Sequence, residues 1–145
     1  MSYLIDTNVI SELRRKQPDA NVVAWFAARS TQSLFVSVLT LGEIRKGIET
    51  LGVENVDAAR RQALRDWLEV DLPMFFMGRI LSVDLLVTER WGNLQARARR
   101  PLPAIDSLLA ATALQHNLTL VTRNVRDFAD LGLSVINPWA DSSVV

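Results

Sequence analysis

Carboxylate and amide side chains recur near the ends of the apolar runs along this chain. They are Asp6, Glu43, Asp106, Asn124 and Asp127. Carboxylates gathered from distant parts of a chain repel one another, and a cation between them removes that penalty. Oxygen ligands of this kind suit Mg²⁺, with Mn²⁺ as an alternative, and hydrolysis of phosphodiester bonds is common chemistry for such a site. The pattern therefore predicts a metal-dependent hydrolytic site.

Each of these residues has a simpler role when it is taken alone. Asp6 could cap the helix that follows it, and Asp127 could cap a turn. Glu43 and Asp106 could be ordinary acids in the first turn of a helix, where the helix dipole favours them. Only their meeting in one cleft would favour a cation over these roles.

The spacing of apolar residues predicts strands that alternate with helices. Strands are expected at residues 3–5, 34–37, 80–83, 118–122 and 134–136. Helices are expected at 20–29, from 41 onward, from Asn55 or Asp57 to about 69, and at 85–99, 104–115 and 125–131. Pro73 is expected to break the chain. This alternation favours a single domain over residues 1–145, a three-layer α/β/α sandwich with a mainly parallel central sheet.

Helix starts would place the acidic residues. Thr7 or Asn8 is expected to cap the segment after Asp6, and Thr40 to cap a helix beginning at Leu41. That start puts Glu43 in a first helical turn. Ligands of parallel sheets bind beyond the carboxyl ends of the strands, so the acids can share one cleft there.

Apolar positions give expectations for the buried faces. Val23, Phe26 and Ala27 are expected on one face of their helix, and Leu86, Trp91, Leu94 and Ala98 on the buried face of another. The four tryptophans are expected mostly in the core or in interfaces. The run 72–77 is apolar but contains a proline, so it could be buried or could form a patch against a partner helix.

Composition narrows the function further. The chain has 16 basic and 16 acidic residues, and 14 of the basic ones are arginines. Clusters at 14–16, at 60, 61 and 65, and at 97, 99 and 100 could contact phosphate, or could reflect codons rich in G and C. The absence of cysteine excludes disulfides and zinc–thiolate sites. His116 is the one histidine, which excludes a ribonuclease that uses two.

Targeting signals are also absent from the sequence. The start lacks the basic and apolar segments of a signal peptide. No apolar run is long enough to span a bilayer. A soluble, cytoplasmic protein without a membrane partner is therefore expected.

Four separated stretches resemble the PIN-domain ribonucleases. They are residues 4–12 (LIDTNVISE), 37–48 (SVLTLGEIRKGI), 105–113 (IDSLLAATA) and 120–128 (LVTRNVRDF). Among these proteins the chain is similar to the VapC toxins, particularly the FitB-like subgroup. Residues 78–81 and 137–139 are similar to that subgroup too. One such stretch would be weak evidence, but the ordered set spans nearly the whole chain.

The resemblance implies a magnesium-dependent endoribonuclease that cuts RNA internally. Its first three acids carry over to Asp6, Glu43 and Asp106. Its fourth position falls on Asn124, where an amide replaces the carboxylate of some relatives, and Asp127 could supply the missing charge. Asp6 and Asp106 would be the direct ligands of one or two metal ions, with Glu43 a metal ligand or the group that activates water.

Hydrogen-bonding neighbours and protein partners follow from the same resemblance. Thr7, Asn8 and Thr122 are expected to orient the carboxylates. The family implies a homodimer, inhibited by a VapB-like antitoxin through which alone it would meet DNA. Two alternatives remain open. One is an RNA-processing or flap-type nuclease without a toxin role, and the other is a non-enzymatic partner of a DNA-binding antitoxin.

Overall fold

A parallel sheet forms the centre of the molecule. The computed structural model describes residues 1–52 and 57–140. The sheet has five strands in the order β3-β2-β1-β4-β5, and all four pairings are parallel. The strands are β1 (Tyr3–Ile5), β2 (Leu34–Ser37), β3 (Ile80–Leu81), β4 (Thr119–Val121) and β5 (Val135–Ile136). The predicted parallel sheet is confirmed, with shorter outer strands than expected.

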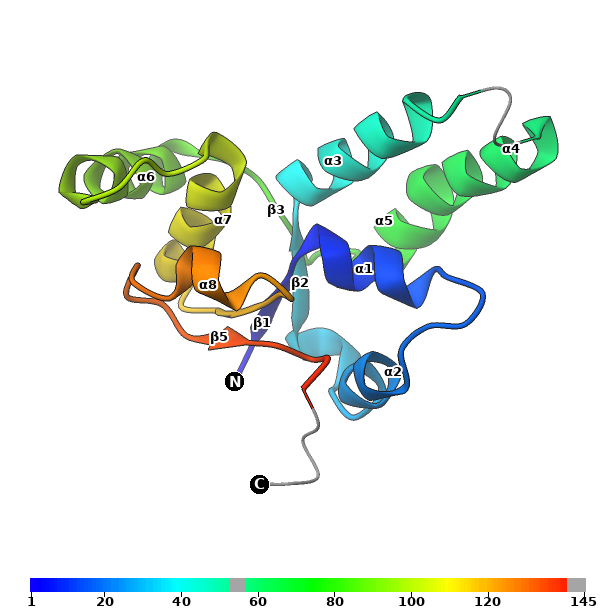
Figure 1. Cartoon of the computed structure of the whole chain (residues 1–145), viewed down its shortest axis with the longest axis horizontal. Helices are drawn as coiled ribbons and strands as arrows, with labels where there is room; N and C mark the ends of the chain where they lie inside the picture. Colours follow the sequence, from blue (N-terminus) through cyan, green and yellow to red (C-terminus); the bar gives the residue numbers. More distant parts are fainter. Residues whose placement is uncertain (53–56, 141–145) are drawn as a thin grey trace.

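Helices cover both faces of this sheet, as the three-layer prediction requires. In Figure 1, α6, α7 and α8 lie on one side of the sheet and α1 to α5 on the other. The helices are α1 (Thr7–Leu13), α2 (Ala20–Ala27), α3 (Val38–Glu49), α4 (Ala58–Asp66), α5 (Leu72–Phe75), α6 (Leu85–Arg97), α7 (Ala104–Gln115) and α8 (Val125–Phe128), with a 3-10 turn η1 (Thr31–Ser33) and a π-helical segment η2 (Trp67–Asp71).

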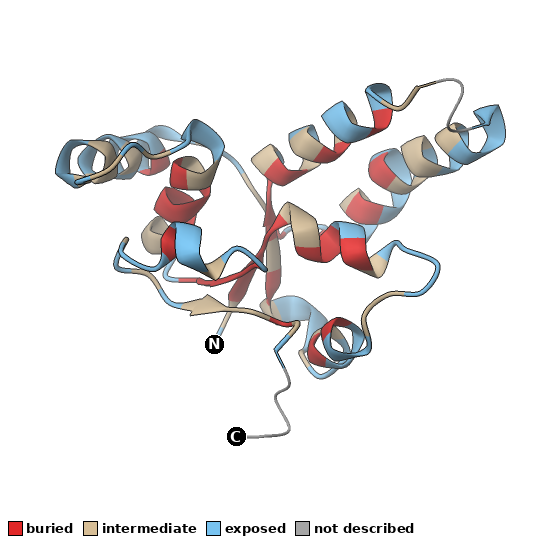
Figure 2. Ribbon diagram, in the orientation of Figure 1, coloured by how far each residue is buried: buried red, intermediate tan, exposed pale blue. Residues whose placement is uncertain are grey.

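The core consists of one apolar cluster on each face of the sheet. Successive residues of a strand point to opposite faces. Tyr3 and Ile5 therefore pack with α1, α2 and α3, whereas Leu4 packs with α7 and α8. Figure 2 shows the inner strands β1, β2 and β4 and much of α7 as buried, the outer strand β5 as intermediate and α6 as largely exposed. No helix in the described ranges is long and apolar enough to cross a membrane.

Two helix caps differ from the prediction. The cap of α1 is Asp6, whose side chain accepts a hydrogen bond from the Thr7 N–H, because β1 ends at the residue immediately before it. Helix α3 begins at Val38 and is capped by Ser37, whose hydroxyl accepts from the Leu39 N–H at 3.0 Å. The expected first-turn position of Glu43 is therefore wrong.

The helix before Pro73 does not stop there, also contrary to prediction. Residues Trp67–Asp71 form a π-helical segment, and the Leu72 N–H bonds to the Trp67 carbonyl. A π-turn shifts the hydrogen-bond ladder by one residue, and Pro73 then falls in the first turn of α5, where a missing N–H removes no helical bond. The chain stays helical from Ala58 to Phe75.

The buried face of α2 is shifted relative to the prediction, whereas that of α6 differs at one position. Helix α2 buries Val22 and Trp25, while Val23 is 40% exposed. In α6 the predicted Leu94 packs against the core, but Val87 is buried in place of Leu86, which is 59% exposed. The helical period was predicted correctly, but its phase depends on how each helix docks on the sheet.

Candidate active site

Asp6 lies at the carboxyl end of the central strand β1 and is fixed through both oxygens. Its side chain is only 6% exposed. Oδ1 accepts from the Thr7 N–H at 2.7 Å, and Oδ2 accepts from the Thr122 hydroxyl at 2.8 Å. A carboxylate with two such donors cannot rotate freely, so its remaining lone pairs face a defined direction.

Thr122 is the centre of this small network. Its hydroxyl donates to Asp6 and accepts from the Asn8 side-chain amide at 3.2 Å and from the Asn124 N–H at 3.1 Å. One donor and two acceptor sites are all that a hydroxyl offers, so its hydrogen-bonding capacity is filled. The expected bond of Thr122 to a carboxylate is present, whereas Asn8 reaches Asp6 only through Thr122.

Glu43 joins the same site through Thr7. The Thr7 hydroxyl donates to Oε1 of Glu43 at 2.6 Å, while the Thr7 N–H donates to Asp6. One threonine thus bonds to two carboxylates that lie 37 positions apart in the sequence. Glu43 lies in the second turn of α3, so this contact rather than the helix terminus sets its position.

The carboxylates of the site repel one another. Burial is the main cause that raises the pKa of Asp6 above 3.8, and the charges of Glu43 and Asp106 raise it further. The hydrogen bonds from Thr122 and Thr7 act in the opposite direction and lower this pKa. Ionised Asp6 is therefore held against an electrostatic penalty that a nearby cation would relieve.

Asp106 lies in the first turn of α7 and is likewise affected by the charges of neighbouring carboxylates. Burial raises the pKa of Asp106, followed by the charges of Asp127 and Glu43. The carboxylates expected from the sequence therefore act on one another across four elements of the fold.

The two candidates for the fourth position, Asn124 and Asp127, are exposed residues of the segment after β4. Asn124 contributes its main-chain N–H to Thr122, and its side chain makes no cap bond to α8. Asp127 lies in the first turn of α8, and its charge acts on Asp106. Both residues line a hollow of about 390 Å³. Asp127 thus brings negative charge toward Asp106, and Asn124 supports the network behind Asp6.

This donor set suits a hydrated hard cation. In the described part of the chain, no three His, Cys, Asp or Glu side chains converge into a ready cage for a metal ion. Mg²⁺ does not need one, because it keeps several waters and takes one or two protein carboxylates. Neighbouring carboxylates whose charges add to burial in raising the pKa values of Asp6 and Asp106 are the observation that fits such an ion.

A basic groove leads away from the acidic residues. Its volume is about 560 Å³. Thr7 and Glu43 form part of its lining, and apolar residues of α3 and η2 form another part. Its cationic residues are Arg14, Arg15, Lys16 and Arg60. The sequence showed these residues as two separate clusters, and only the packing of α1 beside α3 and α4 brings them into one groove.

Other arginines of the predicted clusters serve the fold. Arg65 pairs with Glu49 at 2.9 Å, and Arg100 pairs with Asp130 at 2.8 Å. Arg100 also donates to the Asp127 carbonyl at 2.7 Å. These contacts occupy guanidinium groups that the sequence alone would leave available to phosphate.

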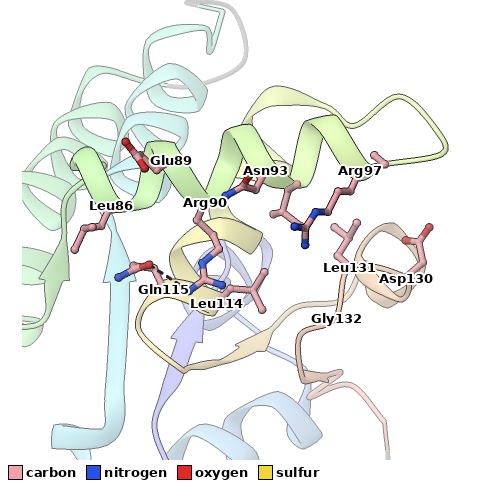
Figure 3. A pocket seen from close by; sticks show the side chains of 12 residues that line it. Leu86, Glu89, Arg90, Asn93, Arg97, Leu114, Gln115, Asp130, Leu131 and Gly132 are labelled. Atoms are coloured by element: carbon pink, nitrogen blue, oxygen red, sulfur yellow. Dashed lines mark hydrogen bonds between the residues drawn. The ribbon is translucent and has the colours of Figure 1, made fainter.

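A second hollow of similar size lies away from the acids. Figure 3 shows it between α6, the C-terminal end of α7 and the turn after α8, with Arg90 beside Gln115. Its volume is about 570 Å³, but none of the predicted site residues lines it. Volume alone therefore does not identify the site of chemistry.

The run 72–77 is partly buried and partly exposed. Leu72 and Phe76 belong to the core, whereas Met74 and Met77 are 65% and 73% exposed. Leu72, Phe75 and Phe76 line an apolar pocket of about 270 Å³, and contact of this run with a partner helix stays a prediction. This pocket shares Arg14 and Trp67 with the basic groove, so the two surfaces are continuous.

The chain matches the family described as "PIN domain" over residues 3–132. It is 39% identical to the plasmid stability protein StbB of Pseudomonas syringae, covering 94% of this chain and 97% of the relative. It is 36% identical to the toxin FitB of Neisseria gonorrhoeae, with coverages of 95% and 99%. It is 34% identical to the VapC ribonuclease Y4jK of Sinorhizobium fredii, with coverages of 94% and 96%.

Solved structures show the same similarity. The crystal structure of FitAcB from Neisseria gonorrhoeae superposes with a TM-score of 0.88 and 34% identity, covering 96% of this chain and 99% of that one. A structure of FitAB bound to a DNA fragment gives a TM-score of 0.86 at 32% identity, with 97% of each chain covered. A toxin–antitoxin complex from Klebsiella pneumoniae gives 0.67 at 27% identity, with coverages of 94% and 98%.

Proposed function

This chain belongs to the PIN-domain family, and from that membership we propose that it is a Mg²⁺-dependent endoribonuclease, the toxin of a toxin–antitoxin pair. The observation that carries the proposal is the buried Asp6 carboxylate, fixed by Thr7 and Thr122, whose pKa is raised further by two other acids. Relatives named toxin and VapC ribonuclease support the activity and the biological role.

The residues divide the chemistry among them. Asp6 and Asp106 hold the metal ion, and Glu43, fixed by the Thr7 hydroxyl, orients a water and accepts its proton. When bound, Mg²⁺ supplies positive charge that polarises the attacking water and the scissile phosphate. Asp127 adds negative charge at the rim, next to Asp106.

The basic groove is the proposed path of the RNA backbone. Arg14, Lys16 and Arg60 line it together with Thr7 and Glu43, so a strand held there by its phosphates passes the acids. Contacts with phosphates depend on charge and not on the base sequence of the RNA. The affinity for RNA is therefore expected to fall steeply as the salt concentration rises. A net charge of zero means that this groove, rather than the whole protein, attracts RNA.

The proposed inhibitor is a small VapB-like antitoxin. The apolar pocket lined by Phe26, Leu72 and Phe75 suits the apolar face of an antitoxin helix, and its continuity with the basic groove lets the same segment reach Glu43. The toxin–antitoxin complex among the similar structures supports such a partner. DNA contact through the antitoxin is supported by the DNA-bound FitAB structure, and a homodimer completes the proposed assembly.

Removing one acid tests the enzymatic proposal. Asp106→Asn is expected to lower cleavage of a labelled RNA in Mg²⁺ by at least about 100-fold, because outer and inner metal-site residues are commonly worth that much. Glu89→Gln, which removes a carboxylate beside the other hollow, is the matched control and is expected to cleave normally. Full activity of folded Asp106→Asn protein would refute the assignment.

Expression in cells distinguishes a toxin from the two alternatives. A toxin arrests growth, and co-expression of the neighbouring small open reading frame relieves the arrest. Cleavage in vitro without arrest would favour an RNA-processing or flap-type nuclease. Binding of the neighbouring product without any cleavage would favour a non-enzymatic partner. Sequencing of RNA 5′ ends after induction would then identify the substrate.

A further inference from the structure

Asp106 differs from the other two acids in what holds its side chain. Asp6 accepts two hydrogen bonds and Glu43 accepts one. Among the hydrogen bonds of the described residues, none reaches the Asp106 carboxylate. The position of this carboxylate must therefore come from the main chain of the first turn of α7.

That first turn has no side-chain cap of the usual kind. Pro103 occupies the position before α7 and makes no side-chain hydrogen bond. A helix start without a polar cap frays more easily than one with it, because its first N–H groups lack partners. Some other contact must keep the turn in place for Asp106 to face the other acids.

The next residue, Ser107, supplies that contact from inside the fold. Its side chain is only 1% exposed. The hydroxyl shares its proton between the carbonyls of Pro103 at 2.7 Å and Ala104 at 3.0 Å. It accepts from the Trp91 indole N–H at 2.9 Å and from the Gln95 side-chain amide at 3.0 Å. Both of its acceptor sites are therefore filled from α6.

Helix α6 thus forms hydrogen bonds with the start of α7 at two positions, Leu102 and Ser107. The Gln95 amide also donates to the Leu102 carbonyl at 3.2 Å, just before the helix begins. Trp91 and Gln95 lie four residues apart, which places them on the same face of α6. A turn held at Leu102 and at Ser107 cannot rotate about the helix axis, and Asp106 lies within it.

We propose that Ser107, bonded to Trp91 and Gln95, is the positioning residue of Asp106 and sets the affinity of the site for its divalent cation. This inference rests on the proposed metal-dependent function. Ser107 touches neither metal nor RNA, and it acts by fixing the turn from which Asp106 projects. Helix α6 thereby contributes to the site without contributing a site residue.

The direct test is the Mg²⁺ affinity of a Ser107→Ala protein. Titration calorimetry in the absence of RNA is expected to show about tenfold weaker binding, the lower end of what supporting partners of metal ligands are worth. Thr112→Val is the matched control. Thr112 is a buried hydroxyl on the same helix, bonded only to the Leu108 carbonyl. It is expected to lose stability with unchanged Mg²⁺ affinity.

A double-mutant cycle removes the partner on α6. Gln95→Met deletes the amide donors and keeps a side chain of similar length. Gln95→Met alone is expected to weaken Mg²⁺ binding several-fold, and adding it to Ser107→Ala is expected to weaken binding less than the two separate losses combined. Fully additive losses would overturn the proposed link between the helices.

The outcomes separate this inference from the proposed function. If the wild-type chain binds no Mg²⁺, the proposed function fails first. If the wild type binds Mg²⁺ and Ser107→Ala, shown to be folded by circular dichroism, binds it equally well, only the positioning role is overturned. An equal drop in affinity for Thr112→Val and Ser107→Ala would also overturn it, because general loosening of α7 would then explain both.

Discussion

At the scale of single residues, the carboxylates beyond β1 make folding depend on pH in an unusual direction. A salt-bridged acid has a lowered pKa and stabilises the fold as pH rises. Here the pKa values of Asp6 and Asp106 are raised by burial and by neighbouring acids. The folded chain therefore binds these protons more tightly than the unfolded chain does.

This sign leads to a prediction about stability without divalent cations. As pH rises from below 3.8 through the raised pKa values, the contribution of these two acids to the free energy of unfolding falls. In urea unfolding with EDTA, the free energy of unfolding of Asp106→Asn is expected to rise relative to that of the wild type as pH increases over this range. The gain at pH 7 is expected to be at most about 1 kcal/mol, the scale of interactions between partly exposed charges. Addition of Mg²⁺ should stabilise the wild type alone. A variant that is less stable than the wild type at pH 7 would contradict the repulsion.

The fourth position gives a second prediction at this scale. The negative charge of Asp127 raises the pKa of Asp106, whereas Asn124 contributes only a hydrogen bond from its main-chain N–H to Thr122. Asp127→Asn is therefore expected to reduce RNA cleavage by about tenfold, within the range for supporting residues of metal sites. Asn124→Ala keeps its N–H and is expected to change cleavage less. Rates of RNA cleavage at saturating Mg²⁺ distinguish the two variants. A larger loss for Asn124→Ala than for Asp127→Asn would assign the fourth position to Asn124.

The candidate site residues were easier to predict from the sequence than the residues that hold them in place by hydrogen bonds. Asp6, Glu43 and Asp106 stand out by residue type and by their places after strands or near helix starts, and the fold brings them together. The roles of Thr7 and Thr122 follow from knowing which strands are neighbours, since β1 and β4 pair directly. Ser107 and Gln95 gave no signal, because a buried hydroxyl and amide on helices are recognised only once the helices are docked.

At the scale of elements, Arg79 joins three segments of the chain around the start of β3. It is 6% exposed, and its guanidinium donates to the carbonyls of Thr31, Leu34 and Phe75. Thr31 begins η1, Leu34 begins β2 and Phe75 ends α5. No carboxylate in the described part of the chain pairs with Arg79, so its buried charge is balanced by these carbonyl dipoles and by the rings of Phe75 and Phe76, over which the guanidinium lies.

Replacing this arginine is expected to loosen those junctions. Arg79→Met leaves three carbonyls without their donor, and the free energy of unfolding is expected to fall by about 3 kcal/mol. Arg45→Met is the control, because Arg45 is 40% exposed and pairs with Glu49 and Glu69 at the surface. Its loss should stay under about 1 kcal/mol. Urea titrations measure both, and equal losses would show that Arg79 is not a structural junction.

Element boundaries show where sequence reasoning stops. Helix α7 was predicted with its observed limits, because Pro103 and the Ala- and Leu-rich run define it. The continuation through Pro73 was missed, because a π-turn depends on which carbonyls the packing leaves unbonded. The phase of α2, and the position of Leu86 on α6, were missed for a related reason. Several apolar residues compete for the buried face, and docking on the sheet selects among them.

At the scale of the whole molecule, Glu43, the basic groove and the apolar pocket form one continuous surface on the α1 to α5 side. The groove shares Thr7 and Glu43 with the acidic site and Trp67 with the pocket. A partner seated in the pocket would therefore lie beside the proposed RNA path. Competition between antitoxin and RNA follows from this arrangement without any change of fold.

A partly exposed phenylalanine of that surface gives the matching prediction. Phe75 lines the apolar pocket and is 38% exposed. Phe75→Lys places a charge in the pocket wall and is expected to weaken binding of the neighbouring antitoxin by at least about tenfold, or roughly 1.4 kcal/mol. RNA cleavage should be retained, because Phe75 does not line the groove. Leu85→Lys, at a 72% exposed position on the other side of the sheet, is the control. Calorimetry that finds both variants binding like the wild type would place the antitoxin elsewhere.

The two outermost strands, β3 and β5, are each only two residues long. An edge that short offers few free N–H and C=O groups to an incoming chain, which is how natural sheets avoid aggregation by strand addition. The core of the sheet is strongly apolar, yet it has almost no open border on which a fibril could grow. The chain is therefore expected to stay dispersed even when the proposed antitoxin is not bound to it.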